Sequence, residues 1–389
     1  MVEWKKLGDI CQIKGRIGFR GYTRDDQVDK GKGAISLSPG NIDNGSMNYE
    51  SCTYITWDKY EESPEIIVNE GDIILCKTAS VGKVARIHHL PEKATINPQL
   101  VLIKNIQTNP QYLFYVLDDK PFQSKIIGLA GIGSVPNVSQ AKLSAIEIPI
   151  PSLSEQIRIV GILDTFTASI DNLKEQIVQR RKQYEYYRDQ LLDLEGKDEK
   201  DIHSWGEFCE MTKGNGVQKV DFVDEGVGCI HYGQIYTHYG SFAYETNKFV
   251  SKEVFYKAKK ASKGDIIMTD TSENVEDICK SVAWLGDNDI AVSNHALIIK
   301  HNQNPKFLSY STQTDSFFIQ KRKVVVGVKV SGIKPDDLAK IKIYLPDIEV
   351  QNRIVSILDT FEASIQNLEA QLSQREKQYE YYRNKLLTF

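Results

Sequence analysis

The chain has 389 residues, of which 41% are hydrophobic and 26% are charged, and its formal net charge is −4. This length accommodates two or three domains with cores of their own. No apolar run approaches a membrane span and the charged first residues do not resemble a signal peptide, so we expect a cytoplasmic protein. The six cysteines are widely spaced without a CxxC pair, which argues against a zinc site or a disulfide framework.

Residues 1–150 have the pattern of a mixed α/β domain. The apolar stretch Leu100–Ile103 predicts a strand, and Gln111–Val116 predicts a short helix. A Gly-Asp-Ile-Ile segment begins at Gly71, and the polar loop Cys76–Lys83 follows it. We therefore expect a framework of strands and helices whose loops carry the function.

A long helix is predicted for residues 151–195. Ser152 is the expected N-cap, and Glu155 is its capping-box partner. Residues then recur at alternating steps of three and four, which is typical of a coiled-coil seam. The seam consists of Leu163, Phe166, Ile170, Leu173, Ile177, Arg180, Tyr184, Tyr187, Leu191 and Leu194. Arg180 either pairs with Glu or a Tyr face across the seam or extends to solvent at its edge.

The second half of the chain repeats the first after a charged linker at residues 196–203. The segment that begins at Gln156 recurs from Gln351, and 26 of 37 aligned residues are identical at a constant shift of 195. Residues 204–345 are the expected second mixed domain, and residues 346–389 are the second long helix. This helix keeps an N-cap in Asp347, and Arg375 repeats Arg180. A duplication therefore decides the architecture.

We predict an α+β fold in which two mixed α/β domains are joined by two long helices. The helices are expected to pack as an antiparallel coiled coil with pseudo-two-fold symmetry. The second domain repeats the Gly-Asp-Ile-Ile segment at Gly264, but the loop Thr269–Asn274 after it has little in common with Cys76–Lys83. Different loops on a common framework indicate two different specificities.

The helix segment Pro151–Asp164, its second copy and the order of domains and helices resemble the specificity subunit of type I restriction-modification enzymes across the whole chain. The resemblance implies two target-recognition domains, each of which reads one half of a bipartite site in double-stranded DNA. It also implies that the helices act as spacers and dock two modification subunits. The implied docking residues are Glu155, Gln156, Arg158, Gln351 and Arg353. The second copy departs from the family pattern at Val350 and Asn352.

Catalysis is expected on partner subunits. The resemblance implies S-adenosylmethionine on the modification subunits, and ATP and Mg²⁺ on partner subunits that include a restriction subunit. The chain itself has no G-x-x-x-x-G-K-[ST] phosphate loop and no Asn- or Asp-Pro-Pro-aromatic tetrapeptide of amino-methyltransferases. We therefore expect no catalytic residue and no metal site in this chain. The competing hypothesis is a non-catalytic coiled-coil scaffold with two ligand- or protein-binding domains.

Candidate DNA contacts follow from the chemistry of base edges. Lys or Arg suits guanine, Asn or Gln suits adenine, and Ser or Thr suits either base. In the first domain we predict base contacts from Asn41, Lys77, Thr78, Ser80, Lys83, Asn97 and Gln99. In the second domain we predict them from Gln234, Tyr236, Thr269, Thr271, Asn274 and His295. Phosphate contacts, which position the protein without specifying sequence, are predicted for Arg16, Arg20, Arg24, Lys321, Arg322 and Lys323. The alternative for each residue is an ordinary solvated side chain.

Overall fold

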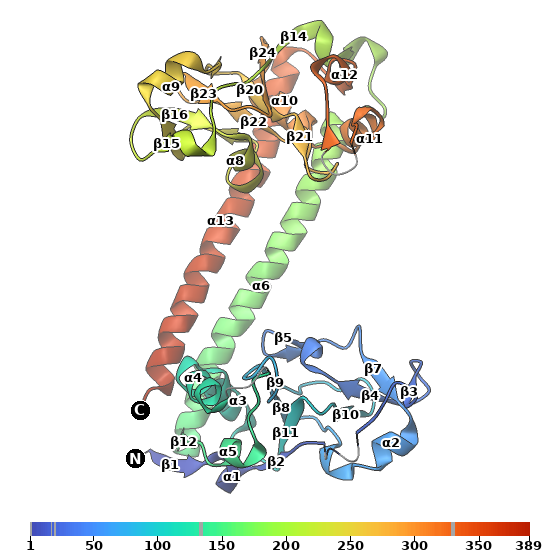
Figure 1. Ribbon diagram of the computed structural model, residues 1–389, viewed down its shortest axis with the longest axis vertical. Helices are drawn as coiled ribbons and strands as arrows, with labels where there is room; N and C mark the ends of the chain where they lie inside the picture. The colour runs from blue at the N-terminus through green and yellow to red at the C-terminus, as the bar shows by residue number, and fades with distance from the viewer. Residues whose placement is uncertain (1, 17, 19–20, 132–134, 328–330) are drawn as a thin grey trace. The chain divides into compact units, whose positions relative to one another are not determined.

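The computed structural model describes residues 2–16, 18, 21–131, 135–327 and 331–389. It divides into two compact units. Unit 1 consists of Met1–Asn172 and Gln371–Phe389, and unit 2 consists of Leu173–Ala370. Two 40-residue helices, α6 (Leu153–Leu192) and α13 (Ile348–Leu387), each contribute residues to both units (Figure 1). Each unit therefore holds one mixed domain and a part of each long helix.

The domain of unit 1 is built on two four-stranded sheets, with strand orders β2-β11-β8-β9 and β10-β4-β7-β3. The strands are β1 (Glu3–Lys6), β2 (Gln12–Lys14), β3 (Gln27–Val28), β4 (Ala34–Leu37), β5 (Ile42–Asp43), β6 (Ser46–Met47), β7 (Thr53–Ile55), β8 (Ile73–Cys76), β9 (Val84–Arg86), β10 (Ala94–Ile96), β11 (Leu100–Lys104) and β12 (Glu147–Ile150). The short helices are α1 (Leu7–Ile10), α2 (Trp57–Glu61), α3 (Pro110–Asp118), α4 (Lys120–Leu129) and α5 (Gln140–Ser144).

The domain of unit 2 is also built on two sheets, but each has five strands, in the orders β14-β24-β20-β22-β17 and β15-β18-β16-β23-β19. Its strands are β13 (Ile202–Ser204), β14 (Cys209–Lys213), β15 (Phe222–Val223), β16 (Val227–Ile230), β17 (Phe242–Ala243), β18 (Lys248–Val250), β19 (Lys260–Ala261), β20 (Ile266–Thr269), β21 (Thr271–Ser272), β22 (Ser281–Trp284), β23 (Ile290–Val292), β24 (Ala296–His301), β25 (Ser331–Gly332) and β26 (Lys342–Tyr344). Its short helices are α7 (Trp205–Phe208), α8 (Tyr232–Thr237), α9 (Lys252–Lys257), α10 (Pro305–Ser311), α11 (Asp315–Val324) and α12 (Pro335–Leu338). The predicted mixed α/β character of both domains is confirmed.

The repeated Gly-Asp-Ile-Ile segments form equivalent turns and strands. Gly71 and Gly264 adopt positive φ angles of 88° and 97°, which suit glycine. The aspartate after each glycine stabilises the turn. The Asp72 carboxylate accepts a hydrogen bond from the amide of Asn69, and the Asp265 carboxylate accepts one from the amide of Ser262. The Ile-Ile pairs then enter the buried strands β8 and β20.

Each domain is joined to its long helix by a buried glutamine. The Gln156 side chain accepts hydrogen bonds from Thr108 and from the backbone amide of Asn109, and it donates one to the carbonyl of Pro151. Gln351 accepts from the amide of Asn304 and donates to the carbonyl of Pro346. Asn109 and Asn304 in turn cap α3 and α10. The glutamines therefore fix the start of a long helix to the start of a short one.

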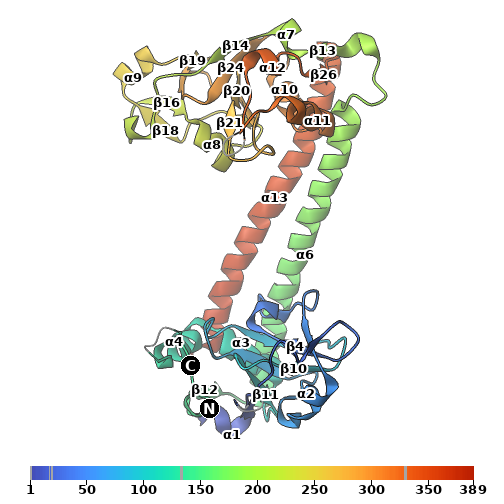
Figure 2. The same ribbon diagram turned by 45° about the vertical axis from the view of Figure 1, so that its right-hand side comes forward.

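Each domain also packs against the C-terminal end of one long helix. In unit 1 the hydrophobic core includes Leu163 from the early part of α6 and Leu387 from the end of α13. Figure 2 shows the end of α13 alongside α4. In unit 2 the core includes Leu358 from α13 and Leu192 from the end of α6. These contacts bury the apolar faces that the repeat predicted.

The seam arginines stack on phenylalanine rings. In unit 1 the Arg375 guanidinium lies 5.7 Å from the ring centre of Phe166, and in unit 2 Arg180 lies 5.9 Å from that of Phe361. We predicted Glu or the face of a Tyr ring as the partner, and the structure has the ring of a phenylalanine instead. The seam prediction is wrong at Leu194, which lies beyond the last helical residue, Leu192. Coiled-coil pairing along the full helices stays a prediction.

The carboxylate of Asp118, at the end of α3 and close to Arg383 of α13, is sensitive to pH. Burial raises the pKa of Asp118 to about 6, and the nearby Arg383 guanidinium opposes this shift. Because the folded pKa exceeds that of the unfolded chain, the stabilising contribution of Asp118 is full at low pH and is lost as the pH rises through about 6. The melting temperature of Asp118→Asn minus that of the parent should therefore increase as the pH is raised from 4.5 to 7.5. Calorimetry at several pH values measures this, and a difference that is constant with pH would contradict it.

Candidate nucleic-acid interface

The polar loops after β8 and β20 lie at equivalent corners of the two domains. In unit 1 the amide of Lys77 donates to the carbonyl of Gln99 at 2.9 Å, and the Lys77 carbonyl accepts from Val138 at 2.9 Å. In unit 2 Asp270 makes the same two bonds, with His295 at 3.2 Å and with Ile333 at 3.0 Å. The two corners share one backbone framework.

The corner of unit 1 brings six of the predicted residues into one region. Asn97 and Gln99 bond to each other, side chain to side chain at 3.2 Å and Gln99 amide to Asn97 Oδ1 at 3.0 Å. Thr78 Oγ1 donates to Asn137 Oδ1 at 2.9 Å. The loop turns at Ala79, whose φ is +64°. Lys77, Ser80 and Lys83 complete this set, which we call the unit 1 corner: Lys77, Thr78, Ser80, Lys83, Asn97 and Gln99. It offers amide, hydroxyl and ammonium groups, which are the groups that read base edges.

The corner of unit 2 has an acid where unit 1 has a lysine. Asp270 is buried, and its carboxylate pairs with the Lys213 ammonium at 2.6 Å and lies 3.8 Å from the His295 ring. Asp270 and Lys213 were not among the predicted contacts, because their pairing joins segments far apart in the chain. A comparison of the two loops position by position would have signalled the change from Lys77 to Asp270. Thr271 and Asn274 follow on the same loop, where Asn274 bonds to Asp277.

An aromatic hollow adjoins the corner of unit 2. The Tyr232 ring lies edge-on to that of His295, with ring centres 5.3 Å apart, and His231 packs on Tyr232 at 4.4 Å. These rings line a cavity of about 400 Å³ together with Lys219 and Asn294. Unit 1 has Ser38 and Pro39 where unit 2 has His231 and Tyr232. The two corners therefore differ in shape as well as in charge.

Two of the predicted base contacts cap short helical turns. The Asn41 side chain is 3% exposed and bonds to Ser38 and Asn48, and Gln234 bonds in the same manner to His231 and Asn247. Both are the third residue of a capping box, which explains their recurrence in the two domains. Their amides already have partners within the protein, so burial favours a structural role for them.

Four further predicted contacts have partners inside the fold. Arg16 is 4% exposed and donates to the Ile96 carbonyl and to Thr95. Thr269 is fully buried in β20, and the Tyr236 hydroxyl donates to the Thr271 carbonyl. Lys321 donates to the carbonyls of Glu276 and Ile278 at 2.8 and 2.7 Å. The burial of Arg16, Thr269 and Lys321 and the hydrogen bond of the Tyr236 hydroxyl within the protein disfavour a direct DNA contact.

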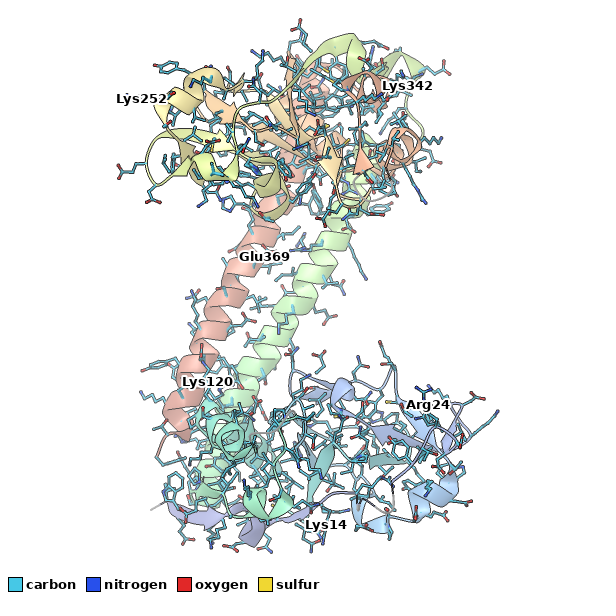
Figure 3. All side chains as sticks on the ribbon, viewed as in Figure 1. Lys14, Arg24, Lys120, Lys252, Lys342 and Glu369 are labelled. Carbon is cyan, nitrogen blue, oxygen red and sulfur yellow. The ribbon has the colours of Figure 1, made fainter. Side chains whose placement is uncertain are left out.

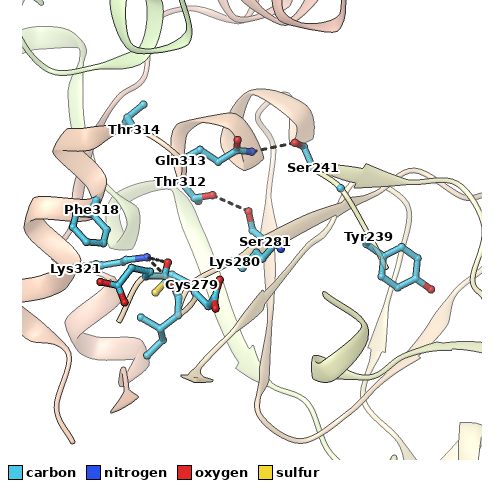
Figure 4. Close-up of a pocket in the computed structure, with 14 residues that line it drawn as sticks. Tyr239, Ser241, Cys279, Lys280, Ser281, Thr312, Gln313, Thr314, Phe318 and Lys321 are labelled. Atoms are coloured by element: carbon cyan, nitrogen blue, oxygen red, sulfur yellow. Dashed lines mark hydrogen bonds between the residues drawn. The ribbon is translucent and has the colours of Figure 1, made fainter. Parts of the chain in front are cut away.

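Lys321 lies in a separate polar cavity of unit 2 with a volume of about 400 Å³ (Figure 4). Figure 4 shows its ammonium group directed into the protein beside Cys279, and hydrogen bonds join Ser281 to Thr312 and Gln313 to Ser241. Burial lowers the pKa of Lys321. Its neighbours Arg322 and Lys323 are exposed in the last turn of α11. Only these two of the three predicted cations of α11 are therefore placed for a phosphate contact.

The remaining predicted phosphate contacts are in unit 1. Arg24 is exposed, and Figure 3 shows it at the outer edge near β3. Arg20 lies outside the described residues. Arg24 is therefore placed for a phosphate contact, whereas Arg16 is buried.

The predicted docking residues divide into buried and exposed members. Gln156 and Gln351 are the buried clamps described above, with exposures of 3% and 0%. Arg158 forms a two-bond ion pair with Glu155 on the α6 surface, at 2.8 and 2.6 Å, and Arg353 is exposed on α13. The Glu155 side chain thus binds Arg158, while its amide donates to Ser152 at 3.4 Å, so the amide half of the predicted capping box is present.

The surface around these residues is partly apolar. Leu153 and Ile157 on α6 are 61% and 56% exposed, and Ile348, the repeat counterpart of Leu153, is 46% exposed. Leu153 and Ile157 are four residues apart on α6, so their side chains are neighbours on the surface of the helix.

Within the described residues, no helix is long and apolar enough to cross a membrane, and no group of three or more His, Cys, Asp or Glu side chains could hold a metal ion. All six cysteines are free thiols. Burial raises the pKa of Cys11 to about 12.

The chain matches the family model of the type I restriction modification DNA specificity domain twice, over residues 1–180 and 198–376. It therefore belongs to the family of type I restriction-modification specificity proteins. A type I restriction enzyme specificity subunit of Haemophilus influenzae is 30% identical over 297 residues, which are 72% of each chain. The specificity subunit of the Escherichia coli enzymes EcoR124I and EcoR124II is 28% identical over 276 residues, 66% of this chain and 65% of the relative.

Solved structures have the same fold. The crystal structure of the type I restriction-modification S subunit from M. genitalium superposes with a TM-score of 0.57 and 16% identity, over 100% of this chain and 96% of that chain. A chain from a study of complex assembly and conformational transition of the type I system gives a TM-score of 0.61 at 16% identity, over 99% and 97%. These similarities confirm two specificity domains with long helices as the fold class.

Proposed function

We propose that this chain is the sequence-specific DNA-recognition subunit of a type I restriction-modification complex. The family match to each half supports this proposal. One observation carries it further: two domains with one backbone framework present corners of different chemistry. Such an arrangement suits a reader of two different half-sites, because each corner can select its own bases.

Each domain reads one half of a bipartite, asymmetric site in double-stranded DNA. In unit 1 the ammonium group of Lys77 and the amides of Asn97 and Gln99 suit guanine and adenine edges. In unit 2 the exposed ammonium group of Lys213, which the buried Asp270 holds in place, and the aromatic hollow form a different reading surface. Arg24, Arg322 and Lys323 contribute phosphate contacts that position the domains.

The long helices dock two modification subunits. The exposed members Glu155, Arg158 and Arg353, together with the apolar residues Leu153 and Ile348, form the proposed docking surfaces. This chain is non-catalytic in the proposal. The modification subunits bind S-adenosylmethionine and methylate adenine, and restriction subunits join through the complex, with ATP and Mg²⁺ bound on partner subunits. A DNA-reading role in this complex places the chain in the cytoplasm.

The first test is to express the chain with the modification subunit encoded beside it and to map N6-methyladenine by single-molecule sequencing. We expect one bipartite, asymmetric motif that disappears when this chain is deleted. A stable complex of the two proteins without any motif would support the scaffold hypothesis instead.

Loop exchange tests the assignment of corners to half-sites. Replacing Cys76–Lys83, or the whole of residues 1–150, with the counterpart from another family member should change one half of the methylated motif. Replacing Thr269–Asn274 should change the other half, and it serves as the matched control. A change of both halves by either exchange would contradict independent reading by the two domains.

A further inference from the structure

The two domains hold the C-terminal ends of the long helices through different charges. In unit 1 the end of α13 is held by ion pairs. Glu380 pairs with Lys120, which is labelled in Figure 3. Arg383 lies 3.6 Å from Asp118 and 3.4 Å from Asp119. The acids that neutralise this arginine belong to the domain.

In unit 2 the end of α6 supplies the acids itself. Arg188, the repeat counterpart of Arg383, forms a two-bond pair with Asp189 of its own helix, at 2.9 and 3.1 Å. Asp193 accepts a hydrogen bond from the amide of Ser316 at the start of α11, at 3.0 Å. The domain has Gln313 and Thr314 where unit 1 has Asp118 and Asp119.

Exchanging the helix ends would break both arrangements. The α13 end has Asn384 and Thr388 at the positions of Asp189 and Asp193. On the domain of unit 2 it would lack the carboxylate that Arg188 binds at 2.9 and 3.1 Å, and the Ser316 amide would lose its acceptor, and both changes cost stability. The α6 end on the domain of unit 1 would add Asp189 to a site that already contains Asp118 and Asp119. Each domain therefore fits the helix end that it holds.

The middle of the helices shows the same preference. In unit 2 Arg181 of α6 forms an ion pair with Glu369 of α13 (Figure 3 labels Glu369). The repeat places Glu376 at the position equivalent to Arg181, and Lys174 at the position equivalent to Glu369. If a second α6 replaced α13, Arg181 would face a lysine. If a second α13 replaced α6, Glu369 would face a glutamate. Flanking charges of this kind decide which helices pair.

We propose that these charges form a pairing code, in which the first half of the chain accepts the second half and rejects a second copy of itself. The second half rejects its own copy in the same way. The remaining apolar contacts are common to both helices, since the Gln-Tyr-Glu-Tyr-Tyr-Arg segment is identical from Gln183 and from Gln378. The apolar seam alone would thus permit pairing of like halves, and the charges supply the discrimination.

The test begins with the full chain, folded with a protease site inserted at Gly196 in the linker. After cleavage, the halves are separated in denaturant and allowed to pair again, and native mass spectrometry counts like and unlike pairs. We expect unlike pairs to exceed the share given by random pairing. Arg181→Glu should raise the share of pairs between first halves, because the new acid is repelled by Glu369 and attracted by Lys174. Lys182→Glu is the matched control, since both helices have lysine there, and it should not raise that share.

A second measurement uses the intact chain, and it tests the pairing code even if the cleaved halves fail to pair again. Arg181→Glu and Glu369→Lys should each lower the melting temperature by about 1–3 °C at low salt, and the double variant should recover most of this loss. The differences should shrink in 1 M salt, which screens them strongly. Random pairing of the halves, or losses that simply add in the double variant, would overturn the proposal.

Discussion

Gln351→Ala should lower the melting temperature of the protein by roughly 6–12 °C, corresponding to about 3 kcal/mol lost from unit 2. The side chain is fully buried and bonds to the amide of Asn304, to Gln303 and to the carbonyl of Pro346. Alanine removes the partner of these groups, of which Pro346 is buried and Gln303 and Asn304 are partly buried, and an unpaired buried group is costly. Differential scanning calorimetry measures the change.

Two controls accompany this variant. Gln156→Ala removes the equivalent clamp in unit 1 and should cost a similar amount. Arg353→Ala, two residues from Gln351 on the exposed face, should leave the melting temperature within about 1–2 °C of the parent while weakening the modification-subunit complex. An equal effect of Arg353→Ala and Gln351→Ala on stability would show that the clamp has no special role.

Lys77→Ala/Gln99→Ala should weaken binding to the specific DNA site by roughly 10- to 100-fold, because a base-edge contact contributes about 1–3 kcal/mol of discrimination. Binding to unrelated DNA should change much less. The backbones of the two residues are joined by the hydrogen bond from the Lys77 amide to the Gln99 carbonyl, and neither side chain forms part of the core. Competition binding with the assembled complex, at several salt concentrations, measures both affinities.

Arg24→Ala provides the contrast to this double variant. An exposed phosphate contact should weaken specific and unrelated DNA to the same degree and should reduce the salt dependence of binding by about one charge. If the double variant behaved as Arg24→Ala does, the corner would be a phosphate contact and the reading of bases would lie elsewhere in unit 1.

Local patterns predicted the framework of this protein well. Pro after Asn109 and Asn304 starts a helix, and Gly-Asp before two isoleucines starts a buried strand, because these signals depend on neighbouring residues alone. The roles of individual polar residues depend on partners distant in the chain. No local sequence pattern indicates the role of Lys321, whose ammonium group donates hydrogen bonds to carbonyls 43 and 45 residues away.

The sequence therefore predicted the region of the candidate DNA-binding site, but only some of the residues that lie there. Lys77 and Gln99 come together because β8 and β11 pair in antiparallel fashion, so that the end of β8 lies beside the start of β11. The sequence predicted strands here but not their pairing. The pairing of Asp270 with Lys213 joins strands whose register no local pattern fixes. Asn41 and Gln234 have the right chemistry for adenine, but burial gives their amides a capping role.

The glutamine clamp has a consequence for how such proteins diversify. Gln156 and Gln351 hold their domains largely through main-chain groups, the amides of Asn109 and Asn304 and the carbonyls of Pro151 and Pro346. Main-chain groups are the same in every protein, so a foreign domain with the same short cap can be attached without any matching change in the helix. Genetic exchange between ancestral copies can then replace a whole recognition domain in one event, and the new target is acquired without an intermediate that fails to assemble.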